Sequence, residues 1–361
     1  MERNMQYGEY MELLREMVAT PSLSFEEEQV RDLISARMSD WGVEHRVLRN
    51  NIMALQKCFD PAKRTLALDA HIDTVPANAG YSFDPFDPGT DPGVVRGLGS
   101  NDDGGSVVSM IAAFRHFADR ELPFNLMLVL SCEEERSGEN GARWIYSDSR
   151  PEGVPLPDWA IVGEPTGMRA ATSERGLLVI DGLAEGVSGH AGRGEGVNAL
   201  YKALDDIQKL RSHEFTRISP IMGKVRMTVT GIKAGTVHNV VPDSCSFVVD
   251  IRPTDAYTNA ELLEELKGLC TSTLTARNLH NRSSATRQDS PLLRTAETLG
   301  LETFSSPTTS DWMRMGFDAI KMGPGDSSRS HRKDEYILAE EVADAIEKYI
   351  RFIEEYGKTL G

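Results

Sequence analysis

The residues best suited to chemistry in this chain of 361 residues are histidines and carboxylates that follow apolar segments. After the apolar run 66–70, His71 and Asp73 lie two positions apart, so on an extended strand both side chains point to the same face. A histidine beside a carboxylate is typical of a metal centre, where the imidazole binds the ion and the carboxylate fixes its tautomer. The alternative is a buried histidine hydrogen-bonded to an aspartate without a metal.

Two acidic segments further along the chain favour the metal. The glycine-rich segment 97–105 carries Asp102 and Asp103 just before an apolar helical pattern. Its spacing fits no phosphate-binding loop and two aspartates would repel an anion, so we predict a cation site, the alternative being a simple helix cap. Three consecutive glutamates, 133–135, follow shortly after the apolar run 124–130. Carboxylates at the end of a buried strand are costly unless they are paired or metal-bound, and the alternative is a solvated acidic turn.

Two further candidate ligands complete a mixed nitrogen and oxygen donor set. Glu164 follows the apolar segment 159–162, and His331 ends the segment Gly323–His331. Two histidines and three carboxylates suit two Zn²⁺ or Co²⁺ ions, with Asp102 able to bridge them. Such a pair, about 3.5–4 Å apart, polarises a carbonyl and activates water, while a glutamate serves as general base. A serine hydrolase is excluded because no G-x-S-x-G motif is present.

In this order, the five motifs resemble the M20 family of metallopeptidases and amidohydrolases over nearly the whole chain. The resemblance implies that His71 binds one metal and that Asp73 orients it. It also implies that Asp102 bridges both metals, that Glu164 completes the shell of the first, and that His331 binds the second.

The resemblance leaves two registers open for the three glutamates. Aligning Gly141 with the family's usual glycine makes Glu134 the general base and Glu135 the ligand of the second metal. A shift by one residue would give these roles to Glu133 and Glu134. The chain also has Gly104 where a lysine is common, which leaves the ligands unchanged but removes an expected positive charge.

Several predicted elements would position these residues. Apolar periodicity predicts a helix that Pro21 ends, and a second helix from Val30 to Met38 that a capping box, Ser24-x-x-Glu27, would start. The segments 52–55 and 66–70 suggest a hairpin that leads into His71. A final amphipathic helix spans 342–353.

The middle of the chain follows a different pattern. Strand, helix, strand, strand, helix and strand are predicted at 177–187, 198–210, 223–232, 244–251, 259–269 and 275–284. This order predicts a ferredoxin-like α+β domain at 175–287, inserted into an α/β catalytic domain of 1–174 and 288–361 with a central mixed sheet flanked by helices. In the resembled family, such an insert is the lid and dimerisation domain.

The resemblance also assigns roles within the insert. His190 matches a histidine that reaches the partner subunit's active site and stabilises the tetrahedral oxyanion, which implies a homodimer. Asn239 and Arg252 match positions that contact the substrate, although an arginine that ends a strand is often only a solvated charge.

Composition limits the classes of partner. The net charge of −16, from 39 basic and 55 acidic residues, would repel nucleic acid and anionic lipid, so we expect neither nucleic acid nor membrane as partner. No apolar run near 18 residues and no leader pattern is seen, which favours the cytoplasm. Scattered cysteines argue against a zinc ribbon or a disulfide framework. A small-molecule substrate is therefore expected.

The resemblance implies hydrolysis of the amide bond of an N-acyl amino acid. The first choice is N2-acetyl-ornithine, cleaved to ornithine and acetate in arginine biosynthesis. Arg252 suits a free α-carboxylate, which favours free N-acyl amino acids over peptides, and the acidic chain would attract the ammonium side chain of ornithine. The alternative is an N-succinyl amino acid, either succinyl-ornithine or succinyl-diaminopimelate, which would want a second cation such as Arg175, Arg193 or Arg329. A non-catalytic binding relative would be expected to lack a ligand or the base, whereas every position is filled here.

Overall fold

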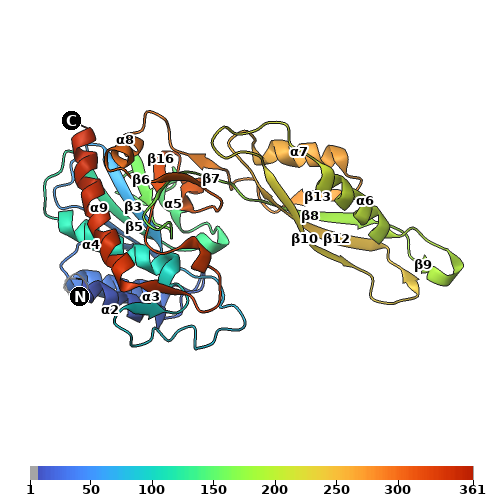
Figure 1. Ribbon diagram of the computed structural model, residues 1–361, viewed down its shortest axis with the longest axis horizontal. Coiled ribbons are helices and arrows are strands. Elements are labelled where there is room, and N and C mark those ends of the chain that lie inside the picture. The colour runs from blue at the N-terminus through green and yellow to red at the C-terminus, as the bar shows by residue number, and fades with distance from the viewer. Residues whose placement is uncertain (1–6, 361) are drawn as a thin grey trace. The chain divides into compact units, whose positions relative to one another are not determined.

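The computed structural model describes residues 7–360, which divide into two compact units (Figure 1). One unit contains the residues up to Thr172, Ala285–Phe304 and the residues from Ser310 onward. The other contains Ser173–Ser284 and Ser305–Thr309, where the sequence predicted an insert at 175–287. No helix within residues 7–360 is long and apolar enough to cross a membrane.

The first unit is built on a nine-stranded mixed sheet with the order β1-β2-β5-β3-β6-β16-β7-β14, and β15 pairs with β7. At its centre β3 (Thr65–His71) lies parallel to both β5 (Asn125–Ser131) and β6 (Trp159–Val162), and β16 (Asp318–Lys321) is parallel to β6. The other strands are β1 (Arg46–Leu48), β2 (Asn51–Leu55), β7 (Ala170–Glu174), β14 (Ser284–Ala285) and β15 (Thr303–Ser306). A separate antiparallel pair joins β4 (Val94–Arg96) to β17 (Tyr336–Leu338).

The predicted hairpin between 52–55 and 66–70 is wrong, because β5 lies between β2 and β3. Both β3 and β5 are buried along their whole length. A strand that is buried on both faces lies inside a covered sheet with a neighbour on each side, and the neighbours of β3 are β5 and β6.

Helices cover the sheet and bury its apolar side chains. One core forms between alternate sheet residues, such as Leu66 and Leu68, and the helices α2 (Gly8–Val18), α3 (Glu28–Asp40), α4 (Gly105–Phe117) and α9 (Ala339–Thr359). Figure 1 shows α4 and α9 side by side in this layer. A second core contains the intervening Ala67 and Met127, together with α5 (Ala142–Ile145) and Trp312. The short helix α8 (Pro291–Thr298) packs against α9.

The second predicted helix exists, but its capping box does not. Helix α3 begins at Glu28, and neither Ser24 nor Glu27 makes a side-chain cap. The Ser24 hydroxyl instead donates to Asp73, and the Glu27 carboxylate accepts the backbone N–H of Phe25 and of Glu133. These side chains therefore bond to the turns around the candidate site rather than to the helix.

The second unit has the predicted βαββαβ order. Its antiparallel sheet has the order β10-β12-β8-β13, formed by β8 (Leu178–Glu185), β10 (Arg226–Ala234), β12 (Ser244–Arg252) and β13 (Thr273–Ala276). With the strands numbered along the chain this is the order 2-3-1-4, as in ferredoxin-like domains. The helices α6 (Ala199–Ser212) and α7 (Asn259–Leu269) bury the alternate apolar residues of one sheet face. The last strand, β13, shares only residues 275 and 276 with the predicted 275–284, so most of that prediction is wrong.

Candidate metal centre

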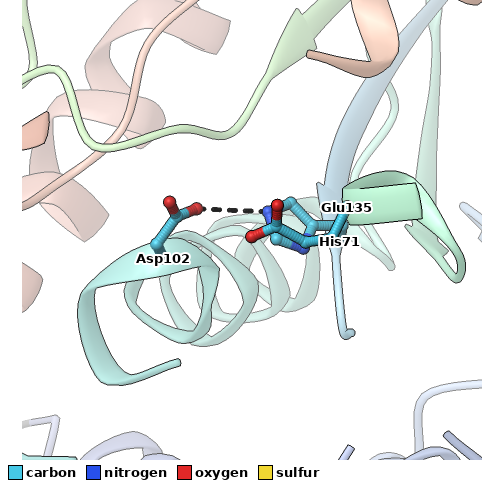
Figure 2. Close-up of side chains that lie close together, drawn as sticks. All are labelled: His71, Asp102 and Glu135. Atoms are coloured by element: carbon cyan, nitrogen blue, oxygen red, sulfur yellow. Dashed lines mark hydrogen bonds and ion pairs between the residues drawn. The ribbon is translucent and has the colours of Figure 1, made fainter. Parts of the chain in front are cut away.

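Three potential ligands meet where β3 and β5 end. His71 is the last residue of β3 and lies opposite Ser131, the last residue of the parallel strand β5. Glu135 lies in the short turn after β5, and Asp102 lies in the turn before α4. One ligand atom from each of His71, Asp102 and Glu135 lies within 4.8 Å of the other two. Figure 2 shows the three side chains together, with a dashed line between His71 and Asp102.

The carboxylate of Asp102 faces two histidines. Its Oδ1 lies 3.2 Å from Nε2 of His71, and its Oδ2 lies 3.6 Å from Nε2 of His331. Nε2 of His331 also lies 2.9 Å from Oε1 of Glu135. One carboxylate with an imidazole at each oxygen has the arrangement of a ligand that bridges two cations.

Asp73 fixes the tautomer of His71. Nδ1 of His71 lies 2.9 Å from the backbone carbonyl of Asp73 and 3.5 Å from its Oδ1. A carbonyl oxygen can only accept, so Nδ1 carries a proton, and Nε2, 3.2 Å from Oδ1 of Asp102, is the ring nitrogen that would bind a metal.

The three glutamates after β5 point to different partners. The Glu133 carboxylate accepts the backbone N–H of Asn140 at 2.9 Å and its side-chain amide at 2.7 Å. The backbone N–H groups of Glu134 and Glu135 donate to Asp73 at 3.0 and 3.1 Å. Glu135 therefore faces the two histidines, while Glu133 is bound within its own loop.

The centre carries more negative charge than its protein partners balance. Burial raises the pKa of Glu134 and of Glu164 well above the usual value, and Glu135 adds to the first shift and Asp102 to the second. Burial also raises the pKa of Glu135. The hydrogen bond with Glu135 raises the pKa of His331 to about 9. Clustered, desolvated carboxylates are relieved by a cation, so the donor set fits divalent metal.

The remaining sequence-predicted residues lie in the second unit. His190 is in β9 (Gly189–His190), which pairs with β11 (Val240–Val241), and the carbonyl of Asn239 accepts the N–H of Ala191 at 3.0 Å. Both His190 and Asn239 are exposed. Arg252 ends β12 and forks onto the Asp250 carboxylate at 2.8 and 3.0 Å.

These three residues do not form one cluster within the unit. Strand β11, the partner of β9, ends three positions before Ser244, the first residue of β12, and Arg252 is the last residue of β12. Figure 1 shows β9 beyond one end of this sheet. Ser244 and Arg252 are eight positions apart, which corresponds to about 26 Å of strand. His190 and Arg252 are therefore at opposite ends of the sheet.

Two further carboxylates, Glu335 and Asp311, support the centre although no sequence motif predicted them. Glu335 accepts the backbone N–H groups of Asn101 and Asp102 at 2.9 and 3.0 Å, and burial raises its pKa to about 8. Asp311 accepts the hydroxyl of Ser131 at 2.6 Å. The only sequence indication for Glu335 was its place four residues after His331 in the same loop.

Known proteins of similar sequence include two amidohydrolases. The chain is 25% identical over 368 residues to acetylornithine deacetylase of Proteus mirabilis (strain HI4320), covering 92% of this chain and 93% of that protein. It is 27% identical over 267 residues to succinyl-diaminopimelate desuccinylase 2 of Ruegeria sp. (strain TM1040), covering 70% and 67%.

Solved structures share the fold along nearly the whole chain. An M20 family metallo-carboxypeptidase from Sulfolobus solfataricus matches with a TM-score of 0.78 at 16% identity, covering 97% of this chain and 99% of that one. A dinuclear metal-binding peptidase of the M20 family from Bacillus subtilis matches with a TM-score of 0.69 at 15% identity, covering 97% of each chain. These matches confirm the predicted α/β fold class.

The family model described as peptidase family M20/M25/M40 matches residues 67–355, which include all five predicted metal ligands. The resemblance seen in the motifs is therefore confirmed. This chain belongs to peptidase family M20/M25/M40 and is a metal-dependent hydrolase of amide bonds in peptides or acyl amino acids.

Proposed function

We propose that this enzyme removes the acyl group from the amine of an N-acyl amino acid, with N2-acetyl-ornithine as first substrate. The observation that carries the proposal is the Asp102 carboxylate between His71 and His331, with Glu135 beside them. The likeness to the Proteus mirabilis acetylornithine deacetylase supports the acetyl group and, with it, a place in arginine biosynthesis.

Two divalent ions, Zn²⁺ or Co²⁺, suit this donor set of imidazole and carboxylate groups. His71, Asp102 and Glu164 would hold one ion, and Asp102, Glu135 and His331 the other. When bound, such a pair polarises the scissile carbonyl and lowers the pKa of water toward about 7.

Glu134 is the proposed general base. Its backbone is held by Asp73 beside Glu135, and Glu133 is turned toward Asn140, which supports the register with Glu134 as base and Glu135 as ligand. Glu134 would take a proton from the attacking water and give it to the departing amine, so no side-chain nucleophile is needed.

Arg252 is the proposed partner of the substrate's α-carboxylate. The Arg252 side chain is 33% exposed, and its Nε and Nη2 donate to Asp250, so a substrate carboxylate would bind at Nη1 or replace Asp250. Asn239 would contribute a further hydrogen bond.

Succinyl removal is the second candidate, favoured by the likeness to the Ruegeria desuccinylase. It needs another cation for the succinyl carboxylate, and two of the three candidate arginines are engaged. Arg175 donates to the carbonyls of Lys224 and Met222, and Arg329 forks onto Glu341 at 2.7 and 3.1 Å. Only Arg193 among the three is exposed, so succinyl removal would depend on this residue, and the likeness to the Proteus mirabilis deacetylase supports the acetyl group as first choice.

A homodimer is the proposed assembly. His190 and Arg252 lie at opposite ends of one sheet, so a single active site that used both would take them from two chains. Within residues 7–360, β10 has a strand partner on one edge only, and a groove of about 720 Å³ between this strand and α6 is lined by apolar residues such as Leu204 and Ile232. Antiparallel pairing of two β10 edges about a twofold axis would cover both the edge and the groove.

The test is hydrolysis of a panel of N-acetyl and N-succinyl amino acids before and after metal removal. Chelation should abolish hydrolysis, and Zn²⁺ or Co²⁺ should restore it. A protein that binds metal but cleaves no member of the panel would be a binding relative of the family, and the proposed function would be wrong.

A further inference from the structure

The segment from Ser22 to Glu27 runs alongside the residues that follow β3. Leu23 forms an isolated parallel bridge with Thr74. The N–H of Thr74 donates to the carbonyl of Ser22 at 2.8 Å, and the N–H of Ser24 donates to the carbonyl of Thr74 at 3.3 Å. The hydroxyl and carboxylate that the sequence assigned to a helix cap are thereby placed next to the metal centre.

Ser24 bonds to the carboxylate that organises this centre. Its hydroxyl donates to Oδ2 of Asp73 at 2.6 Å. Asp73 is completely buried, and its Oδ1 and Oδ2 accept the backbone N–H groups of Glu134 and Glu135, respectively. Ser24 is thus a side-chain donor to the group that holds both glutamates.

Glu27 takes the preceding amide of the same turn. Its Oε1 accepts the N–H of Glu133 at 3.2 Å and that of Phe25 at 2.7 Å, while Oε2 accepts the side-chain amide of Asn50 at 2.8 Å. Glu133 has a φ of 62°, a left-handed conformation that residues with a side chain rarely adopt. Such a conformation persists only where the surroundings fix it, and Glu27 is part of those surroundings.

We propose that Ser24 and Glu27 are positioning residues for the Glu134–Glu135 pair. Three consecutive backbone N–H groups, those of residues 133–135, donate to two carboxylates, Glu27 and Asp73. Glu27 belongs to the segment 22–27, and Asp73 accepts a hydrogen bond from Ser24 of the same segment. This fixes the turn so that Glu135 points at the metal site and Glu134 at the scissile bond. The effect on rate rests on the proposed function, whereas the effect on metal affinity does not.

The test compares Ser24→Ala with Ser24→Thr, which keeps the hydroxyl, and adds Glu27→Gln. Ser39→Ala and Glu28→Gln are matched controls on α3, because both residues are exposed and the Ser39 hydroxyl bonds only within its own helix, to Ser35. Zn²⁺ dissociation constants are measured by competition with a chromophoric chelator, and kcat and KM with N2-acetyl-ornithine.

Loss of a group that supports metal ligands typically weakens metal affinity or activity by about 10- to 100-fold. Ser24→Ala should therefore weaken one Zn²⁺-binding step and lower kcat, each by about tenfold, with KM almost unchanged. Ser24→Thr should recover most of both losses, and both controls should behave as wild type. Glu27→Gln should likewise weaken Zn²⁺ binding and lower kcat.

Equal losses in Ser24→Ala and Ser24→Thr would refute the role of the hydroxyl. Wild-type Zn²⁺ affinity in both Ser24→Ala and Glu27→Gln would refute positioning altogether. If the wild-type protein binds Zn²⁺ but cleaves no N-acyl amino acid, the proposed function fails, and the affinities alone still decide whether the segment positions the turn.

Discussion

Replacing Glu134 by glutamine separates the proposed base from the neighbouring glutamates. An amide has nearly the shape of a carboxylate but cannot take a proton, and the backbone N–H of Glu134 that bonds to Asp73 at 3.0 Å is unaffected. Burial raises the pKa of Glu134, so the ionised form is unfavourable in the metal-free protein and a neutral side chain should not lower stability. We expect the Glu134→Gln variant to fold and to retain metal.

The expected loss is in kcat. Positioned proton transfer contributes about 10²- to 10⁴-fold to a rate, which corresponds to about 2.7–5.4 kcal/mol in the activation barrier. KM should change little, because the base is not assigned to substrate binding. The assay follows release of the free amine from N2-acetyl-ornithine, with bound zinc measured on the same samples.

Glu133→Gln is the matched control. Its carboxylate accepts two hydrogen bonds from Asn140, and replacing one oxygen by an amide would lose one of them, at a cost of about 1.5–3 kcal/mol in the free energy of unfolding. This variant should therefore melt at a lower temperature yet keep a kcat near that of wild type. An inactive Glu133→Gln beside an active Glu134→Gln would refute the proposed register.

Further outcomes concern assembly, substrate and pH. Mixing inactive His190→Ala with inactive Glu134→Gln should regenerate activity in heterodimers, and no recovery despite proven subunit exchange would place His190 outside the partner's site. Arg252→Ala should mainly raise KM, and wild-type kcat/KM should be higher for N2-acetyl- than for N2-succinyl-ornithine; a succinyl preference of about tenfold, or about 1.4 kcal/mol, would overturn the acetyl assignment. Burial raises the pKa of Glu335 to about 8 and that of Glu164 well above its usual value, so near neutral pH the metal-free folded chain binds more protons than the unfolded one. Its stability should fall as pH rises, and a melting temperature of the metal-free protein that rises from about pH 6 to about pH 8 would contradict this sign.

The parts of the fold that could be predicted are those with strong local patterns. The fully buried strand β5 is a nearly continuous apolar run, β3 is apolar on one face, and the βαββαβ order follows from alternating periods of two and 3.6 residues. Strand neighbours are not local information. The run that forms β2 could have paired with β3 by sequence proximity, but β5, more than fifty residues further along the chain, lies between them.

The residues of the candidate centre likewise include some that the sequence could predict and some that it could not. Residues at strand ends, such as His71, were visible because an apolar run stopped at a metal-binding side chain. Glu335 could not be predicted, because its partners are the backbone N–H groups of Asn101 and Asp102, more than two hundred positions away in the chain. A carboxylate that accepts backbone N–H groups has no sequence pattern of its own.

The misassigned capping box shows why local chemistry alone cannot decide such cases. A hydroxyl followed three residues later by a carboxylate can satisfy the free N–H groups of a helix start, and Ser24 and Glu27 have that spacing. The turn after β5 offers competing partners, because Glu133 is left-handed and its N–H, with the next two, points away from any strand or helix partner toward Glu27 and Asp73. N–H groups at the exposed start of α3 can bond to water, whereas the N–H of Glu133 is in a buried residue and needs a protein acceptor. Leaving the buried N–H of Glu133 without an acceptor would cost more free energy than leaving a helix N–H to water, so the Glu27 carboxylate bonds to Glu133. This cost depends on burial, which only the folded chain defines.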